Sequence, residues 1–180
     1  MLVKTYCAAV NGLDVTTVTI EVSLTKGVMF RMTGLGDTAV REGRDRMAAA
    51  LVNNGYLFPN ADITVNMAPA DLRKEGSGFD LPLAIGVLAA SKQIEPVGLD
   101  RIMLVGELGL DGALQPVKGA LPIAMRAKAD GFVALVVPQQ NVREAAVVEG
   151  IRVYGMSQMK EVISMKRYRR RLNPKLVDFI

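Results

Sequence analysis

The sequence predicts an α+β fold, with antiparallel strands in its N-terminal part and a mixed α/β arrangement in its C-terminal part. Polar and apolar residues alternate over residues 14–24, as in a half-buried antiparallel strand. Residues 81–91 are almost wholly apolar and predict a buried helix at the centre of the domain. After residue 102, helix and strand patterns alternate, which favours parallel pairing. The 180 residues are enough for one substantial hydrophobic core.

Strands open the chain. Residues 2–10 and 14–24 have strand patterns, and Asn11-Gly12 between them is typical of a hairpin turn. Lys26-Gly27 then leads into a third strand over residues 28–32. These three strands predict an antiparallel meander.

The first helix is predicted over residues 38–53. Asp37 is a good N-cap, and Asn54-Gly55 provides the stop signal. Apolar residues recur at helical spacing and predict the buried stripe, which consists of Val40, Met47 and Leu51.

Two binding interpretations of this region are not favoured. Gly34-Leu35-Gly36 resembles part of a dinucleotide fingerprint, but the third glycine is replaced by Ala39 and the preceding strand is expected in a meander. The arginines of the helix could suggest a nucleic-acid surface. However, their four-residue spacing from acidic residues predicts internal pairs on a solvated face, Arg41 with Asp45 and Glu42 with Arg46.

The central segment predicts a strand at residues 63–66, a charged loop and the buried helix. Asp80 is expected to cap this helix, and Pro82 suits its first turn because the missing N–H would have no intrahelical partner there. A glycine-bearing loop before a helix can present backbone N–H groups to an anion or an oxyanion. The simpler interpretation is a capped core helix after a surface loop.

The second half begins with two strands joined by Asp111-Gly112, a strong hairpin signal. These strands are expected at residues 102–108 and 113–117. The remaining elements are helices at 119–130, 140–148 and 158–165, and strands at 132–137 and 151–154.

Composition excludes several kinds of chemistry. The chain has no histidine and one cysteine, Cys7, so Ser-His and Cys-His pairs, thiolate zinc clusters and an intrachain disulfide are all excluded. Any catalysis would need lysine or carboxylate chemistry. No apolar run is long enough to span a bilayer and no secretory signal is visible, so we expect a cytoplasmic protein without a membrane partner.

Charge is concentrated at the C-terminal end. The formal net charge is +4, but residues 166–175 contain six basic residues and no acidic one. Residues 1–165 hold 16 basic and 17 acidic residues, so this part is almost neutral.

Three ordered motifs resemble the N-terminal domain of the YifB/ComM family, which are Mg-chelatase-like AAA+ ATPases. They are residues 34–42, residues 65–86, and residues 106–112 with 116–119. The resemblance covers residues 2–165 and implies a Lon-protease-like fold, similar to the second domain of certain ribosomal proteins. Residues 166–180 are then expected to be a basic linker leading towards an AAA+ domain. The Lon-like domain of the RadA recombination ATPases is a related alternative, which the Lys74-Glu75-Gly76 loop does not favour.

The resemblance implies that the parent protein is an ATP-driven, ring-shaped hexameric motor that acts on branched DNA in recombination or natural transformation. Its partners would be the protein's own ATPase domain, further copies of the chain and DNA. ATP and Mg are expected in the downstream domain. This chain contains no Gly-x-x-x-x-Gly-Lys-Ser/Thr phosphate loop, so no cofactor is assigned to any residue here.

The resemblance to Lon also raises a Ser-Lys peptidase as an alternative, because this pair works without histidine. Lys74-Glu75-Gly76 matches Lon's motif, but the nucleophile and lysine positions fall on Gly78 and Leu121. We therefore expect no catalytic residue, and the alternative dyad would be Ser77 with Lys118. Nothing in the sequence supports a metal-insertion subunit.

The basic cluster supplies the candidate contacts to nucleic acid, because closely spaced cations displace counterions from phosphates. A solvated linker between domains is an equal alternative. The candidate residues are Lys166, Arg167, Arg169, Arg170 and Arg171.

Overall fold

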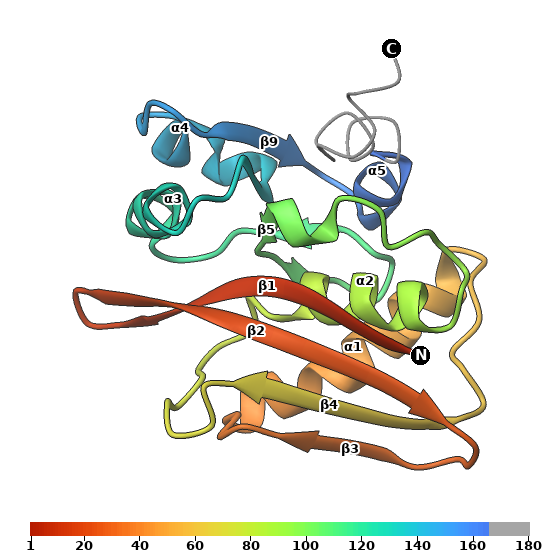
Figure 1. Ribbon diagram of the computed structural model, residues 1–180. Helices are drawn as coiled ribbons and strands as arrows, with labels where there is room; N and C mark the ends of the chain where they lie inside the picture. The colour runs from red at the N-terminus through yellow and green to blue at the C-terminus, as the bar shows by residue number, and fades with distance from the viewer. Residues whose placement is uncertain (166–180) are drawn as a thin grey trace, which may run out of the picture.

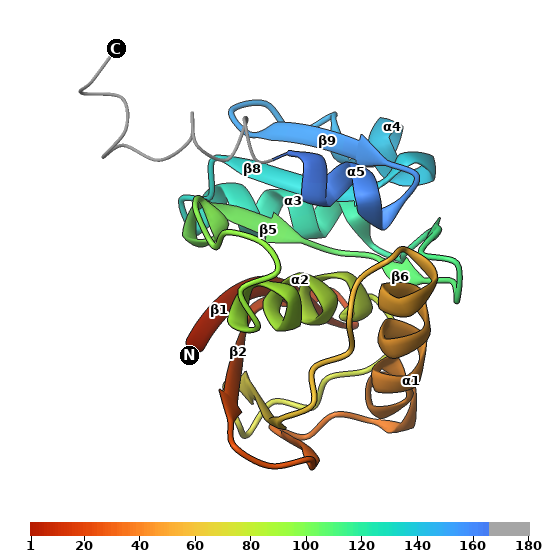
Figure 2. The ribbon, with the colours of Figure 1, turned by 90° about the vertical axis from the view of Figure 1, so that its right-hand side faces the viewer.

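The computed structural model describes residues 1–165, and residues 166–180, with the whole basic cluster, lie outside the described part. A four-stranded sheet forms one side of the molecule, and helices α1 (Thr38–Asn53) and α2 (Asp80–Ala90) lie against one of its faces (Figures 1 and 2). The C-terminal half stacks above α2 and contains a three-stranded sheet. The predicted α+β character, with antiparallel strands first, is confirmed.

The N-terminal hairpin forms as predicted. Strands β1 (Leu2–Asn11) and β2 (Asp14–Thr25) pair antiparallel, from Leu2 opposite Ser23 to Asn11 opposite Asp14. The alternation in β2 places Val18, Ile20 and Val22 in the core.

The predicted three-stranded meander is wrong. Strand β3 (Phe30–Thr33) pairs with β4 (Asp62–Ala68) and is parallel to it, while β4 pairs antiparallel with β2. The sheet order is therefore β1-β2-β4-β3. Strand β4 comes from much later in the chain and lies between two strands that are neighbours in sequence. Local turn signals carry no information about such an insertion.

Helix α1 has the predicted limits because local signals fix both its ends. The Asp37 carboxylate accepts a hydrogen bond of 2.8 Å from the Val40 N–H. Asn54 is the C-cap, and Gly55 follows with a φ of +82°. The predicted stripe of Val40, Met47 and Leu51 is buried.

Helix α2 is the predicted central helix, and each of its residues is buried. It lies in the middle of the molecule in both ribbon views (Figures 1 and 2). The predicted capping role of Asp80 is wrong. Asp80 is the first residue of the helix, Phe79 occupies the N-cap position without a side-chain bond, and the Asp80 carboxylate is used elsewhere.

The predicted strand at residues 102–108 divides into two strands of different sheets. Strand β5 (Ile102–Leu104) pairs with β8 (Ala134–Pro138), whereas β6 (Glu107–Leu108) forms a hairpin with β7 (Leu114–Gln115). Gly106 separates them because its backbone bonds to the start of α2. Its N–H donates to the Gly78 carbonyl at 2.9 Å, and its carbonyl accepts from the Leu81 N–H at 3.0 Å.

The parallel pairing expected in the second half is confirmed. The three-stranded sheet has the order β5-β8-β9, with β9 spanning Arg152–Met156. The predicted helix at 140–148 is only a 3-10 turn followed by the short α4 (Val142–Ala145). Helices α3 (Ala120–Ala129) and α5 (Met159–Ser164) match their predictions to within two residues at each end. In the described part of the chain, no helix is long and apolar enough to cross a membrane.

Candidate functional site

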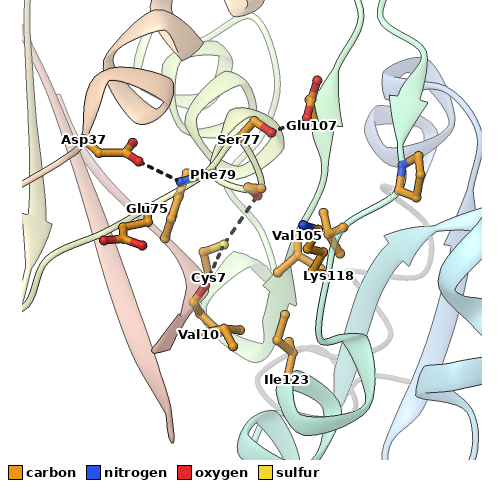
Figure 3. A pocket seen from close by; sticks show the side chains of 15 residues that line it. Cys7, Val10, Asp37, Glu75, Ser77, Phe79, Val105, Glu107, Lys118 and Ile123 are labelled. Atoms are coloured by element: carbon orange, nitrogen blue, oxygen red, sulfur yellow. Dashed lines mark hydrogen bonds between the residues drawn. The ribbon is translucent and has the colours of Figure 1, made fainter. Parts of the chain in front are cut away.

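A pocket of about 550 Å³ opens between the loop before α2, strand β1 and the segment that leads into α3 (Figure 3). We call it the central pocket. Its lining combines ionisable side chains with an apolar floor. The residues are Cys7, Ala8, Val10, Asp37, Glu75, Gly76, Ser77, Gly78, Phe79, Val105, Glu107, Pro116, Val117, Lys118 and Ile123.

Ser77 is the hydroxyl-bearing residue of this lining, and its hydroxyl donates a hydrogen bond to the Glu107 carboxylate (Figure 3). Lys118 lines the same pocket. Among residues 1–165 no hydrogen bond joins the Ser77 oxygen to the Lys118 nitrogen. The hydroxyl is therefore oriented towards the Glu107 carboxylate and not towards the Lys118 amine, as a Ser-Lys pair would require.

The start of α2 does not offer free donors to an anion. The Asp80 N–H donates to the Ser77 carbonyl, and the Leu81 N–H donates to the Gly106 carbonyl. Pro82 has no N–H, and the Leu83 N–H donates to the Phe79 carbonyl. The N–H donors in the first turn of α2 thus already have acceptors within the protein, which argues against an oxyanion site made by these groups.

An ion pair between the partly buried Arg46 and the buried Asp80 joins α1 to α2. The Arg46 Nε and Nη2 atoms lie 2.6 and 3.0 Å from the two Asp80 oxygens. Asp80 is 1% exposed, and its carboxylate also accepts from the Leu108 N–H at 3.1 Å. Burial raises the pKa of Asp80, although Arg46 opposes this effect; the hydrogen bond to Asp80 raises the pKa of Arg46.

Gly43 makes this pair possible. A Cβ atom at that position of α1 would lie 2.5 Å from Asp80 Oδ1. A glycine in the middle of a helix costs stability relative to alanine, so its presence here is explained by the carboxylate that packs against it.

Lys74 is fully buried and anchors the loop that precedes the pocket. Its ammonium donates to the carbonyl of Gly34 at 2.6 Å and to the carbonyl of Pro69. Burial lowers the pKa of Lys74. The residue therefore acts as a structural tie between the loop and the end of β3, and it does not line the central pocket.

Cys7 lines the pocket but is only 1% exposed. Its Sγ atom lies 3.6 Å from the Gly78 carbonyl oxygen, and burial raises the pKa of the thiol to about 12. A neutral, buried thiol is a poor nucleophile. Among the described residues, no group of three or more potential metal-ligating side chains comes together.

Comparisons with known proteins place the chain in a family. The family model for subunit ChlI of Mg-chelatase matches residues 20–141. The chain is 44% identical over 143 residues to YifB of Escherichia coli, covering 79% of this chain and 28% of YifB. It is 40% identical over 159 residues to the competence protein ComM of Haemophilus influenzae, covering 88% of this chain and 31% of ComM. The chain belongs to the YifB/ComM family.

The YifB/ComM-family chain spans about a third of the length of these relatives. A weaker match links it to Lon protease 2 of Bacillus subtilis, at 26% identity over 104 residues, covering 57% of this chain and 18% of that protein.

In this YifB/ComM-family chain, Gly78 and Leu121, the two positions where the resemblance to Lon would put the nucleophile and the lysine, carry neither a hydroxyl nor an amine. Gly78 contributes its carbonyl to bonds with Gly106 and Cys7, and Leu121 is a partly exposed residue of α3. The alternative pair, Ser77 and Lys118, lines one pocket, but in the described part of the chain the Ser77 hydroxyl bonds to Glu107 instead of Lys118. The five candidate nucleic-acid contacts at residues 166–171 lie outside the described residues.

One reason for rejecting a dinucleotide site in this family member was wrong, because β3, α1 and β4 do form a βαβ unit with parallel strands. The Gly34-Leu35-Gly36 loop is nevertheless occupied by the protein itself. Lys74 bonds to Gly34, and the backbones of Leu35 and Asp37 bond to that of Lys74. The Asp37 carboxylate also covers the start of α1, where a phosphate would have to bind.

The sequence did not indicate the bond from Ser77 to Glu107 or the ion pair of Asp80 with Arg46. It also did not indicate that Lys74 is buried and bonds to backbone carbonyls. The predicted pair of Glu42 with Arg46 does form, at 3.8 Å, but the Asp80 contact is shorter and more buried. Arg41 donates instead to the Gly36 carbonyl, and Asp45 pairs with Arg44. The signal that could have indicated the Asp80 site was Gly43 in the middle of a predicted helix.

Proposed function

We propose that this chain is a non-catalytic N-terminal domain, Lon-protease-like in fold, of a Mg-chelatase-like AAA+ ATPase that moves DNA. Membership of the YifB/ComM family supports the assignment to an ATPase of this kind. The bond from the Ser77 hydroxyl to Glu107 in the central pocket is the observation that supports a non-catalytic domain. The match to Lon protease 2 supports the fold name. The name of ComM, a competence protein, supports a role in the uptake or recombination of DNA.

In this proposal, ATP and Mg act in a downstream domain and subunits assemble into a ring. The described part of the chain would order the subunits or guide the DNA. The central pocket does not suit a nucleic acid, because Asp37, Glu75 and Glu107 outnumber Lys118 in its lining. A phosphate backbone would be repelled there, so DNA is expected to contact the basic cluster instead.

The proposal predicts that replacing Lys166, Arg167, Arg169, Arg170 and Arg171 by alanine weakens DNA binding. Each phosphate contact contributes roughly 0.9 to the slope of log K against log salt, so the loss of five contacts should lower the slope by up to about 4.5. The measurement is fluorescence anisotropy with a branched DNA in the parent protein, at several salt concentrations. Replacing the exposed Arg143 and Arg152, which lie on α4 and β9, is the control. An unchanged slope in the five-residue variant would remove the cluster from the proposal.

A second candidate is the Ser-Lys peptidase, and one observation favours it: Ser77 and Lys118 line the same pocket. For a reaction, the hydroxyl would have to leave Glu107 and turn to the lysine amine, and the amine would have to lose its proton. Within residues 1–165 the hydroxyl bonds to Glu107 and not to the lysine amine, so this candidate ranks second.

A further inference from the structure

We propose that the central pocket binds a lysine or arginine side chain from an extended segment of a partner protein. This site is separate from the DNA contacts proposed above, and it does not depend on them. The proposal rests on the charge of the lining, on the acceptor atoms that remain open and on the apolar floor.

The ionisable residues of the pocket favour a cation. Asp37 and Glu75 lie on one side, and Glu107, which bonds to Ser77, lies on the other (Figure 3). Lys118 lines the same pocket. Three carboxylates against one ammonium give this lining a net negative charge. The carboxylates do not converge in the way a bound metal ion requires, since no metal-binding group is present among residues 1–165. The cation that suits them is therefore larger and carries several donors.

Acceptor atoms remain available on both sides of the pocket. Ser77 donates to one oxygen of Glu107, and a carboxylate has about four acceptor positions, so Glu107 can accept further bonds. Glu75 pairs with Arg73 at 3.1 Å, but both side chains are more than half exposed, and such a pair is easily exchanged. Asp37 is already held by the Val40 and Gly76 N–H groups and contributes mainly its charge.

The aliphatic floor of the pocket suits the methylene stem of a lysine or arginine side chain. Val10, Val117 and Ile123 line it with aliphatic groups. Lysine and arginine bury their methylene stems on apolar surface while the charged end reaches polar groups. A volume of about 550 Å³ also accommodates the flanking peptide backbone.

The test is an NMR titration of the 180-residue chain with three capped pentapeptides of alanine that carry arginine, leucine or glutamate at the centre. We expect the arginine peptide to bind about tenfold more tightly than the glutamate peptide, with leucine between them. The amide shifts should be confined to the residues that line or flank the pocket, which are 7–10, 37, 75–79, 105–107, 117–118 and 123. Equal affinity for arginine and leucine, preference for glutamate, shifts elsewhere or no binding at millimolar peptide would each overturn the proposal.

Variants separate charge recognition from folding. Glu107→Gln keeps an acceptor for Ser77 and should weaken arginine binding several-fold, and Glu75→Gln, at an exposed position, should weaken it as well. Lys118→Ala should strengthen it, because a repelling charge is removed. Glu149→Gln makes the same charge change at an exposed residue outside the pocket and should have no effect. A similar loss in Glu149→Gln would contradict recognition by the pocket. All these titrations are done without DNA, so they do not depend on the motor assignment.

Discussion

Arg46→Leu is expected to destabilise the protein by about 3–5 kcal/mol at pH 7, because it leaves the Asp80 carboxylate buried without its cation. Asp80 would then retain only the Leu108 N–H among its present partners in residues 1–165. The free energy of unfolding from a urea titration measures the loss.

The pH dependence of this loss follows from the sign of the Asp80 shift. Burial already raises the folded-state pKa of Asp80 above its value in the unfolded chain. The folded protein therefore loses stability as the pH rises from the unfolded-state pKa of Asp80 through the higher folded-state pKa, because the carboxyl must ionise while buried. Removing Arg46 raises the pKa further. The deficit of Arg46→Leu should therefore be smaller at pH 4 than at pH 7, since a protonated Asp80 needs no cation.

The double variant Arg46→Leu/Asp80→Asn is the control for this prediction. It removes the charge but keeps the shape of the buried side chain, so it should recover much of the stability lost in Arg46→Leu. A deficit that is the same at both pH values and is not relieved in the double variant would show that Arg46 acts through packing alone.

Gly34→Ala is expected to cost about 3 kcal/mol or more, because two penalties combine. Gly34 has a φ of +103°, which residues with a Cβ rarely adopt, and a Cβ there would lie 2.2 Å from the Met67 carbonyl oxygen. Relieving this clash would require a shift of the Gly34 backbone, whose carbonyl accepts the bond from buried Lys74. Thermal unfolding and urea titration both measure the effect.

Gly76→Ala is the matched control for Gly34→Ala. Gly76 also has a positive φ, of +84°, but a Cβ there would meet no atom of residues 1–165 within 4 Å. It should lose only about 1–2 kcal/mol, the conformational part of the penalty. Equal losses at the two positions would mean that the approach of Gly34 to β4 is less close than described.

The sequence allowed the helices to be predicted where their limits depend on local signals. Asp37 and Asn54-Gly55 act within one turn of α1, and the apolar run of α2 needs no knowledge of its partners to indicate burial. Strand pairing is different, because β4 enters between β2 and β3 and Gly106 breaks an apparently continuous strand through bonds to α2. These contacts join residues far apart in the chain, and no periodicity encodes them.

The same limit applies to the site. The match of Lys74-Glu75-Gly76 to Lon's motif located the correct loop, but Lys74 is turned into the protein while Glu75 lines the pocket. Ser77 meets Glu107 from a strand 30 positions later, and Asp80 meets Arg46 from a helix 34 positions earlier. Such pairs follow from the packing of α1, α2 and β6, which the sequence pattern alone does not give.

The central claim, that this domain carries no peptidase, is tested most directly by mass spectrometry of peptide termini. The parent protein is incubated with ATP and a library of unstructured peptides, alongside its Ser77→Ala and Lys118→Ala variants. We expect the unmodified protein to generate no new termini above the level of either variant. Cleavage by the unmodified protein that disappears in both variants would contradict the claim and would establish Ser77 and Lys118 as a catalytic pair.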